Sequence, residues 1–253
     1  MLDKTRYAAE YQFVLSVLSF YTRLIAPGSE PPDLGGKLLY AGLLDEGGRA
    51  LISAANIAGA ASLCVTSDAL AQKRAVRDGV VDFLVTSLDE ALRILKNELR
   101  KRAPVAVCIA AEPADVKSQM SERGVESDLL RSSVEEGNDA PMPADIALVS
   151  WSVSSAPARW MPKLDAYALE CAGELPEVTR RWLRMSPRYL GRLAQFIHVV
   201  LANQAFASRF MEGAMALENG KIPLKLQVSY RGASEEFNAP NWDKDEESLV
   251  PSP

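Results

Sequence analysis

Three glycines and two carboxylates stand close together around residue 45, in a pattern that can hold or repel an anion. The stretch AGLLDEGGRAL contains Gly42, Gly47, Gly48, Asp45 and Glu46. Glycines let backbone N–H groups approach a phosphate, and a following helix adds the positive end of its dipole. The GxGxxG pattern is missing, and each carboxylate repels a diphosphate by on the order of 1 kcal/mol even in solvent. Two interpretations stay open, a remnant ligand loop and a plain strand-to-helix turn.

The other reactive residue types are isolated along the chain. His198 is the only histidine and lies in an apolar stretch that we expect to be helical, which favours a packed or hydrogen-bonded side chain and supports neither a metal site nor a Ser/His/Asp set. Cys64, Cys108 and Cys171 are widely spaced and odd in number, which indicates buried free thiols and a reducing compartment.

A group of aromatic, serine and arginine residues follows the run that we expect to be the last strand of the sheet. It lies where side chains reach a ligand crevice, although two tryptophans closing a core explain it equally simply. The group consists of Trp151, Ser152, Ser154, Ser155, Arg159 and Trp160.

Composition limits the class of protein and its partners. The chain has 253 residues, of which 48% are hydrophobic and 24% charged, as in an ordinary globular protein. Its net charge of −5 comes from the segment after residue 233, and the remainder carries equal numbers of acidic and basic residues. Without a basic face, binding to nucleic acid or to anionic lipid is not expected, and the apolar run from Phe13 to Leu18 is too short for a membrane span. We expect a cytoplasmic location.

The predicted elements that would position these residues alternate between strands and helices, as in an α/β fold. Residues 1–26 contain a predicted amphipathic helix that packs on the domain. From residue 37 short apolar runs alternate with helical segments, which predicts a parallel sheet. The clearest helix covers residues 87–102, where Ser87 and Glu90 form a capping box. The expected strands are 38–43, 62–66, 80–85, 105–110, 128–130 and 146–153.

The C-terminal part is predicted to be mainly helical. After a loop over residues 134–143 and the last strand of the sheet, Ser186 and Pro187 are expected to start a helix that ends at Asn219 and Gly220. Residues 222–230 alternate like a strand. The fold class is therefore an α/β three-layer, Rossmann-like parallel sheet with flanking and C-terminal helices, with one domain over 37–230 and an acidic, disordered tail over 231–253.

Four consecutive blocks resemble the central cofactor-binding domain of the urocanase family, in the same order and spacing. They read GGKLLYAGLLDEGGRAL, CVTSDALAQKRAVRDGVVDFLVTSLDEAL, PVAVCIAAEPADVKSQMSERGVESDLL and MSPRYLGRLAQFIHVVLANQAF. The resemblance covers about residues 13–230. It implies a Rossmann-like, NAD-binding domain and a homodimer, since urocanase is a dimer that hydrates urocanate with tightly bound NAD as an electrophile.

The resemblance also implies which residues would meet the cofactor. The family's phosphate loop corresponds to residues 44–48, and its ribose-binding acid falls at Thr66, with Asp68 as a substitute. The implied cofactor-binding residues are Gly42, Gly47, Gly48, Thr66 and Asp68; no catalytic or metal-binding residue is implied. Asp45 and Glu46 replace small residues of that loop, which argues against NAD.

Three functions follow from this interpretation. Nothing in the chain corresponds to the substrate-binding and acid–base regions of urocanase, so we expect a protein that does not hydrate urocanate and binds a small ligand or a partner at the crevice, as a homodimer. A diverged NAD-dependent hydratase or lyase-like enzyme is one alternative. A structural dimerisation subunit is the other.

Overall fold

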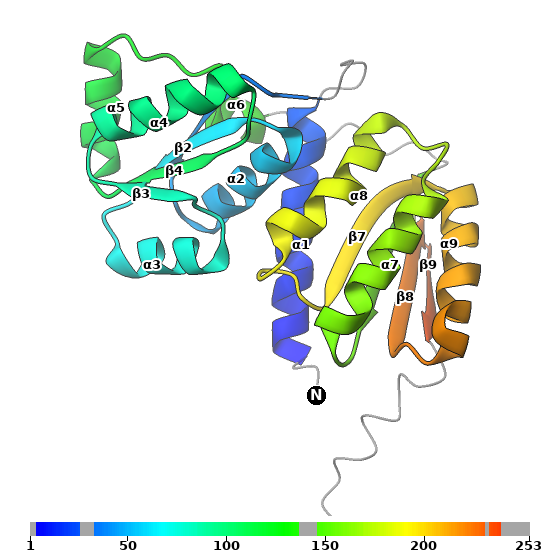
Figure 1. The fold of residues 1–253 in the computed structure, drawn as a ribbon. Coiled ribbons are helices and arrows are strands. Elements are labelled where there is room, and N and C mark those ends of the chain that lie inside the picture. The colour runs from blue at the N-terminus through cyan, green and yellow to red at the C-terminus, as the bar shows by residue number, and fades with distance from the viewer. Residues whose placement is uncertain (1–3, 26–32, 137–145, 231–232, 239–253) are drawn as a thin grey trace, which may run out of the picture. The chain divides into compact units, whose positions relative to one another are not determined.

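The chain folds into two compact units, each with its own sheet. The computed structural model describes residues 4–25, 33–136, 146–230 and 233–238. One unit, the parallel unit, comprises residues 16–139; the other, the antiparallel unit, comprises residues 1–15 and 140–253. The sequence predicts one domain over residues 37–230, and the structure has two units in its place (Figure 1).

The parallel unit confirms the predicted Rossmann-like α/β sheet. Its five strands are all parallel and lie in the order β3-β4-β2-β1-β5. Helices α2 and α3 lie on one side of this sheet and α4 and α5 on the other (Figure 1). Strands alternate with helices as β1 (Leu38–Leu43), α2 (Glu46–Ala58), β2 (Ala61–Val65), α3 (Ala69–Asp78), β3 (Phe83–Val85), α4 (Leu88–Lys101), β4 (Ala106–Ile109), α5 (Pro113–Glu122), β5 (Leu129–Leu130) and α6 (Arg131–Glu135).

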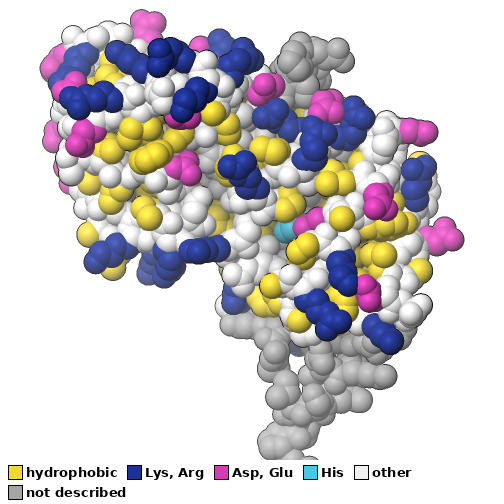
Figure 2. Space-filling view, in the orientation of Figure 1, with side chains coloured by type: hydrophobic (Ala, Val, Ile, Leu, Met, Phe, Trp, Pro, Cys, Tyr) yellow, Lys and Arg dark blue, Asp and Glu magenta, His cyan; other side chains and the backbone are white. Residues whose placement is uncertain are grey.

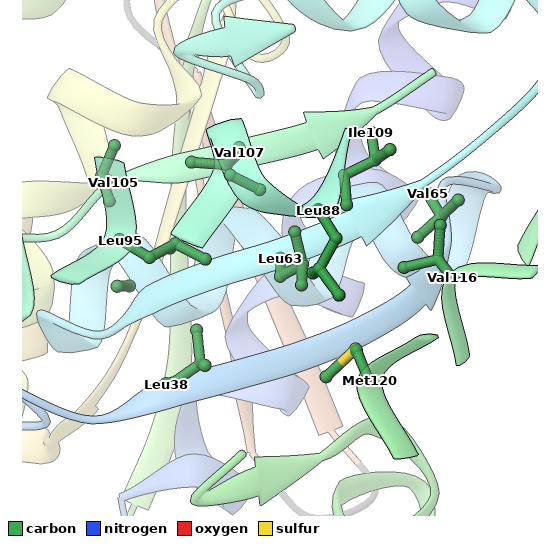
Figure 3. Packing of buried hydrophobic residues seen from close by; sticks show 12 residues of the cluster. Leu38, Leu63, Val65, Leu88, Leu95, Val105, Val107, Ile109, Val116 and Met120 are labelled. Atoms are coloured by element: carbon green, nitrogen blue, oxygen red, sulfur yellow. The ribbon is translucent and has the colours of Figure 1, made fainter. Parts of the chain in front are cut away.

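The core of the parallel unit consists almost entirely of aliphatic side chains. Leu63 of β2 and Val107 of β4 face Leu88 and Leu95 of α4, and all four side chains are buried (Figure 3). Helices cover both faces of the sheet, so its central strands are continuous apolar runs rather than alternating ones. This packing fixes β1, β2 and β4 side by side and brings their carboxyl ends to one edge.

Helix α4 forms where the capping pattern predicts it. The Ser87 hydroxyl accepts the Glu90 N–H at 3.3 Å, and the Glu90 carboxylate accepts the N–H of Thr86 at 3.0 Å. In a standard capping box the Glu90 carboxylate would accept the N–H of the N-cap residue, Ser87; here it accepts the N–H of the preceding residue, Thr86. Both bonds satisfy N–H groups that the helix itself cannot.

The antiparallel unit corrects the predicted place of the last strand. Residues 146–153 do form a strand, β6, but it pairs antiparallel with β7 and β8, and the sheet order is β7-β6-β8-β9. Helices α7 and α9 contact β6, and α8 contacts β7. The elements are β6 (Ile146–Val153), α7 (Pro157–Cys171), α8 (Glu177–Leu190), β7 (Ile197–Asn203), α9 (Gln204–Ala216), the 3₁₀ helix η1 (Leu217–Gly220), β8 (Leu224–Tyr230) and β9 (Ala233–Asn238).

The long helix predicted from Ser186 to Asn219 is wrong. Helix α8 continues through Ser186 and Pro187, and the apolar run after Phe196 is strand β7, which places His198 in a sheet. The run contains Ile197, Val199 and Val200, whose branched Cβ atoms favour strands, whereas helical spacing alone does not distinguish the two structures in so short a run.

Two predictions for irregular segments are also wrong in part. Residues 134 and 135 belong to α6 rather than to a loop, and residues 137–143 lie outside the described residues. Residues 233–238, assigned to a disordered tail, form β9 against β8. Residues 239–253 lie outside the described residues. The predicted N-terminal helix is confirmed as α1 (Lys4–Leu24).

Candidate crevice at the carboxyl ends of the parallel strands

The candidate site lies where β1 and β5 end side by side. From β1 the chain crosses to β2 on one side, and it later returns to place β5 on the other side. A parallel sheet binds ligands at such a switch point, outside the carboxyl ends of its strands. The loop between β1 and α2 carries Gly47 and Gly48, and α6 begins with Arg131 directly after β5.

The glycines of this loop have different structural reasons. A Cβ at Gly48 would lie 2.3 Å from the carbonyl oxygen of Leu43, so the turn itself excludes any side chain there. A Cβ at Gly47 would lie 2.8 Å from Nη2 of Arg131, so that glycine leaves room for the guanidinium. Gly42 has φ +65° and open space around its Cβ position. Only Gly42 therefore borders unfilled space.

Asp45 and Arg131 occupy the position where the fold would hold a phosphate. The Asp45 carboxylate accepts the Gly48 N–H at 2.7 Å and caps α2. Nη1 of Arg131 donates to the same Asp45 oxygen at 2.8 Å and to the Leu43 carbonyl at 3.2 Å, and its Nε donates to Glu135 at 2.7 Å. The positive end of α2 is thus met by the chain's own carboxylate.

The electrostatics of this group keep both partners ionised. Partial burial raises the pKa of Asp45, but hydrogen bonds from Arg131 and Gly48 outweigh it and hold the pKa below its usual value. Burial lowers the pKa of Arg131, and its bonds to Asp45 and Glu135 reverse that effect and raise it. With Glu46 nearby, three carboxylates stand against one guanidinium, so the group is net negative.

Thr66 and Asp68 serve the start of the next helix. Asp68 caps α3 by accepting the Leu70 N–H at 2.7 Å, and its own N–H donates to the Thr66 hydroxyl at 3.2 Å. The side-chain amide of Gln72 donates to the Thr66 carbonyl at 2.9 Å. Both predicted residues lie after β2, next to β1, but their described hydrogen bonds are local to this turn.

A pair of thiols lies beneath the same edge. Cys64 of β2 and Cys108 of β4 are register partners on neighbouring strands, and both side chains are buried. The neighbouring Cys108 thiol, with burial, raises the pKa of Cys64 well above its usual value, whereas the Cys64 thiol and the Thr66 N–H lower the pKa of Cys108. All three cysteines are free, as the sequence predicts.

The residue that sequence reasoning missed is Arg131. It follows β5 directly, and the carboxyl ends of neighbouring parallel strands meet at one edge, so a basic residue there is placed to reach the β1 loop. That signal was present in the sequence. It required knowing that β5 lies next to β1, which no local pattern reveals.

These residues do not fit the diphosphate of NAD. The Gly48 N–H is already bonded to Asp45, and the space over Gly47 is filled by Arg131. A diphosphate would have to displace a carboxylate that carries two good hydrogen bonds, while two further carboxylates stand nearby.

The second predicted cluster, around Trp151, lies in the antiparallel unit and is mainly core. Trp151 and Trp160 are both buried, as the simpler interpretation holds. Arg159 lies 4.2 Å from the Trp160 ring centroid. The indole N–H of Trp151 donates to Asp165 at 3.2 Å, and that carboxylate also bonds His198. His198 is thus hydrogen-bonded, in agreement with one of the roles expected for it.

The fold and the edge geometry define a Rossmann-like α/β protein whose candidate ligand site carries an internal ion pair at the start of α2. Residues 24–151, about half of the chain, match the family described as the urocanase Rossmann-like domain. The chain therefore belongs to that family, which confirms the resemblance of the first three sequence blocks; the fourth block, residues 185–206, lies outside the matched residues. The match covers the parallel sheet and ends within β6.

Neither a membrane-spanning helix nor a metal-binding cluster is present in the described residues. None of the helices in the described ranges is long and apolar enough to cross a membrane. In the same residues, no three His, Cys, Asp or Glu side chains gather in a way that would hold a metal ion.

Proposed function

We propose that this urocanase-like protein does not hydrate urocanate and instead binds a small molecule without a diphosphate at the crevice between β1 and β5. The observation that carries the proposal is the Asp45–Arg131 ion pair at the start of α2. It supplies the counter-charge that a phosphate would otherwise provide there. Its occupancy of the space over Gly47 favours a ligand that binds beside the pair.

The surroundings of the pair support a ligand with an apolar part. Leu43 and Leu130 end the two neighbouring strands, and both are exposed large hydrophobic residues. Together with the open space at Gly42, they give an apolar rim next to a net-negative group. An uncharged or cationic small molecule meets these conditions better than an anion does.

Native mass spectrometry of the purified full chain tests this proposal. We expect no NAD adduct and no rise in melting temperature with added NAD. The variant Asp45→Gly/Glu46→Gly/Arg131→Ala, which opens the start of α2, should gain measurable NAD binding. Glu46→Gly alone is the matched control, because it leaves the Asp45–Arg131 pair in place and should stay unable to bind. NAD bound to the wild-type protein would contradict the proposal and favour the enzyme alternative.

The proposed location is the cytoplasm, and the three free buried thiols support it. A fluorescent fusion imaged beside a cytoplasmic marker tests the location. Signal from an oxidising compartment would contradict it.

A second candidate function, self-association, is favoured by the open edge of the parallel sheet. Strand β3 pairs only with β4 among the described strands, and Phe83 and Leu84 on β3 and Leu70 and Val76 on α3 are exposed. Figure 2 shows hydrophobic side chains among charged ones on the face that it draws. Exposed apolar residues on an edge strand are an association surface. The helices α1, α8 and α9 bury large apolar residues, among them Val14, Leu190 and Phe210, so they offer less apolar surface for association.

Light scattering after size-exclusion chromatography tests self-association. We expect a dimer for the wild-type chain and a monomer for Phe83→Lys. Leu169→Lys, at an exposed leucine of the antiparallel unit, is the matched control and should remain dimeric. A monomeric wild-type chain would exclude this function.

A further inference from the structure

The antiparallel unit contains a paired histidine and aspartate that the crevice does not use. His198 lies on β7 and is the register partner of Trp151 on β6, while Asp165 lies on α7. Nδ1 of His198 lies 2.6 Å from Oδ1 of Asp165, and the Trp151 indole N–H donates to the same oxygen at 3.2 Å. Three elements of the unit therefore converge on one carboxylate oxygen.

This geometry sets the state of the imidazole. A carboxylate accepts hydrogen bonds, so Nδ1 carries the proton and donates it. In the neutral ring the lone pair is then on Nε2, which has no hydrogen-bond partner among the described residues. A carboxylate that fixes one ring nitrogen and leaves the other as an acceptor is the arrangement of a general base.

The pair lies just beneath the surface of the unit. The His198 side chain is 7% exposed and that of Asp165 is 12% exposed. Leu169, one helical turn beyond Asp165 on α7, is exposed, and Met161, one turn before it, is buried. Met161, Asp165 and Leu169 therefore share one face of α7, so apolar side chains border the pair along the helix.

The composition of the neighbourhood selects the class of substrate. With a neutral imidazole the pair carries one negative charge, and the ring next to it is the indole of Trp151, with centroids 6.0 Å apart. The ring of Phe210 is tilted by 58° against that indole, with the ring centroids 4.9 Å apart. A negative group set among aromatic rings disfavours anions and favours uncharged, largely apolar molecules.

Packing alone gives no reason for this pair. Burying a carboxylate costs free energy unless hydrogen bonds compensate it, and apolar side chains of similar volume avoid that cost. The adjacent positions of β7, Ile197 and Val199, are buried and aliphatic. His198 is the one histidine of the chain, and its position in the sheet lies outside the residues that match the urocanase family.

We propose that Asp165 and His198 form a general-base site that activates water toward small uncharged esters, independently of the crevice in the parallel unit. His198 is the catalytic residue and Asp165 the positioning residue. Nε2 takes a proton from a water molecule while that water's oxygen bonds to the acyl carbon. The carbon–oxygen bond to the alcohol then breaks, and the alkoxide takes the proton back from Nε2, which restores the neutral ring.

Hydrolysis of p-nitrophenyl acetate by the full chain tests the site. His198→Gln should remove the protein-dependent rate, and Asp165→Asn should lower it by about tenfold or more, toward the contribution typical of a positioned base. Asp115→Asn, at an exposed aspartate of the parallel unit, is the matched control and should leave the rate unchanged. An Asp165→Asn rate equal to wild type would overturn the proposal.

A second measurement needs no variant, so it decides the matter even if the substituted chains fail to fold. Diethyl pyrocarbonate acylates neutral imidazole, and this chain has a single histidine. We expect the folded wild-type chain to be labelled at His198, hydrolysis to fall in proportion, and hydroxylamine to restore both. A folded chain that is not labelled, or that is labelled without loss of hydrolysis, would show that His198 is only a structural residue.

Discussion

The two sheets of this chain place their charged groups differently. In the parallel unit the core is aliphatic, and the ion pairs Asp45–Arg131 and Lys37–Asp128 stand at the ends of strands. In the antiparallel unit polar groups lie inside, since Glu10 and His198 are buried and Asp165 nearly so. Charged residues at strand ends close or shape a crevice, whereas charged residues inside must be matched by hydrogen bonds from several elements. The difference indicates that the family match describes only one of the two candidate sites.

The largest effect is expected from a change at the turn of the parallel unit. Gly48→Ala places a methyl group against the Leu43 carbonyl, so the loop must shift or the start of α2 must open. We expect a loss of about 3 kcal/mol, at the upper end of what overpacking costs. Hydrogen exchange should show the loss in β1 and α2 and spare β6 and β7. Gly173→Ala, where nothing stands within 4 Å, is the control, and equal losses for both would contradict the geometry.

The next largest effect is expected inside the antiparallel unit. The buried carboxylate of Glu10 accepts the Phe196 N–H at 3.1 Å and an Arg6 N–H at 2.9 Å. Glu10→Ala leaves the Phe196 amide without this acceptor, which should cost about 2 kcal/mol. Glu10→Gln keeps an acceptor oxygen and should lose less than half of that. Chemical denaturation followed by exchange in β7 measures both, and equal losses would show that charge, not the acceptor, matters.

A smaller effect separates the two roles of Asp45. Asp45→Ala removes the cap of α2 and the ion pair and should cost about 1 kcal/mol, whereas Asp45→Asn keeps a capping oxygen and should cost only a few tenths. The denaturation midpoint of each variant gives these values. If the asparagine variant loses as much as the alanine one, the ion pair with Arg131 is the larger contribution.

The smallest effect is the response of the parallel unit to acid. Interactions in the folded chain lower the pKa values of Asp45, Asp78 and Asp128. Groups whose folded pKa is depressed stabilise the fold above the unfolded pKa of about 4 and lose that contribution as pH falls through the folded value. The melting temperature should fall between pH 6 and pH 3, a range chosen to span about that pKa. Hydrogen exchange over the same range should rise first in β1. Asp45→Asn should flatten this dependence, and an unchanged slope would exclude Asp45 as a source.

Local signals in the sequence predicted the parallel unit well. Helix α4 was identified by Ser87 and Glu90, and β1, β2 and β4 by short apolar runs, because capping and continuous burial are encoded by adjacent residues. Strand β7 was mistaken for helix because its apolar run fits either period. The decisive signal was the β-branched residues around His198.

Contacts between distant residues explain what the sequence did not reveal. The loop glycines and Asp45 were identified as a unit, but Arg131 joins them only through the pairing of β5 with β1. His198 was identified as a residue with a partner, but Asp165 reaches it from another element 33 positions away. Spacing carries no information about such pairs, since they are fixed by which elements become neighbours.

Helix α1 has a consequence for the order in which the chain can be assembled. Glu10, in the first half of α1, accepts a hydrogen bond from the Phe196 N–H, 186 positions later in the chain. Residues 16–139, in contrast, form a unit of contiguous sequence. On the ribosome, the parallel sheet has all its strands before the first strand of the antiparallel one is translated. The amino-terminal turns of α1 must therefore wait, solvated, until translation has passed β7, so the unit built from both ends of the described chain closes last.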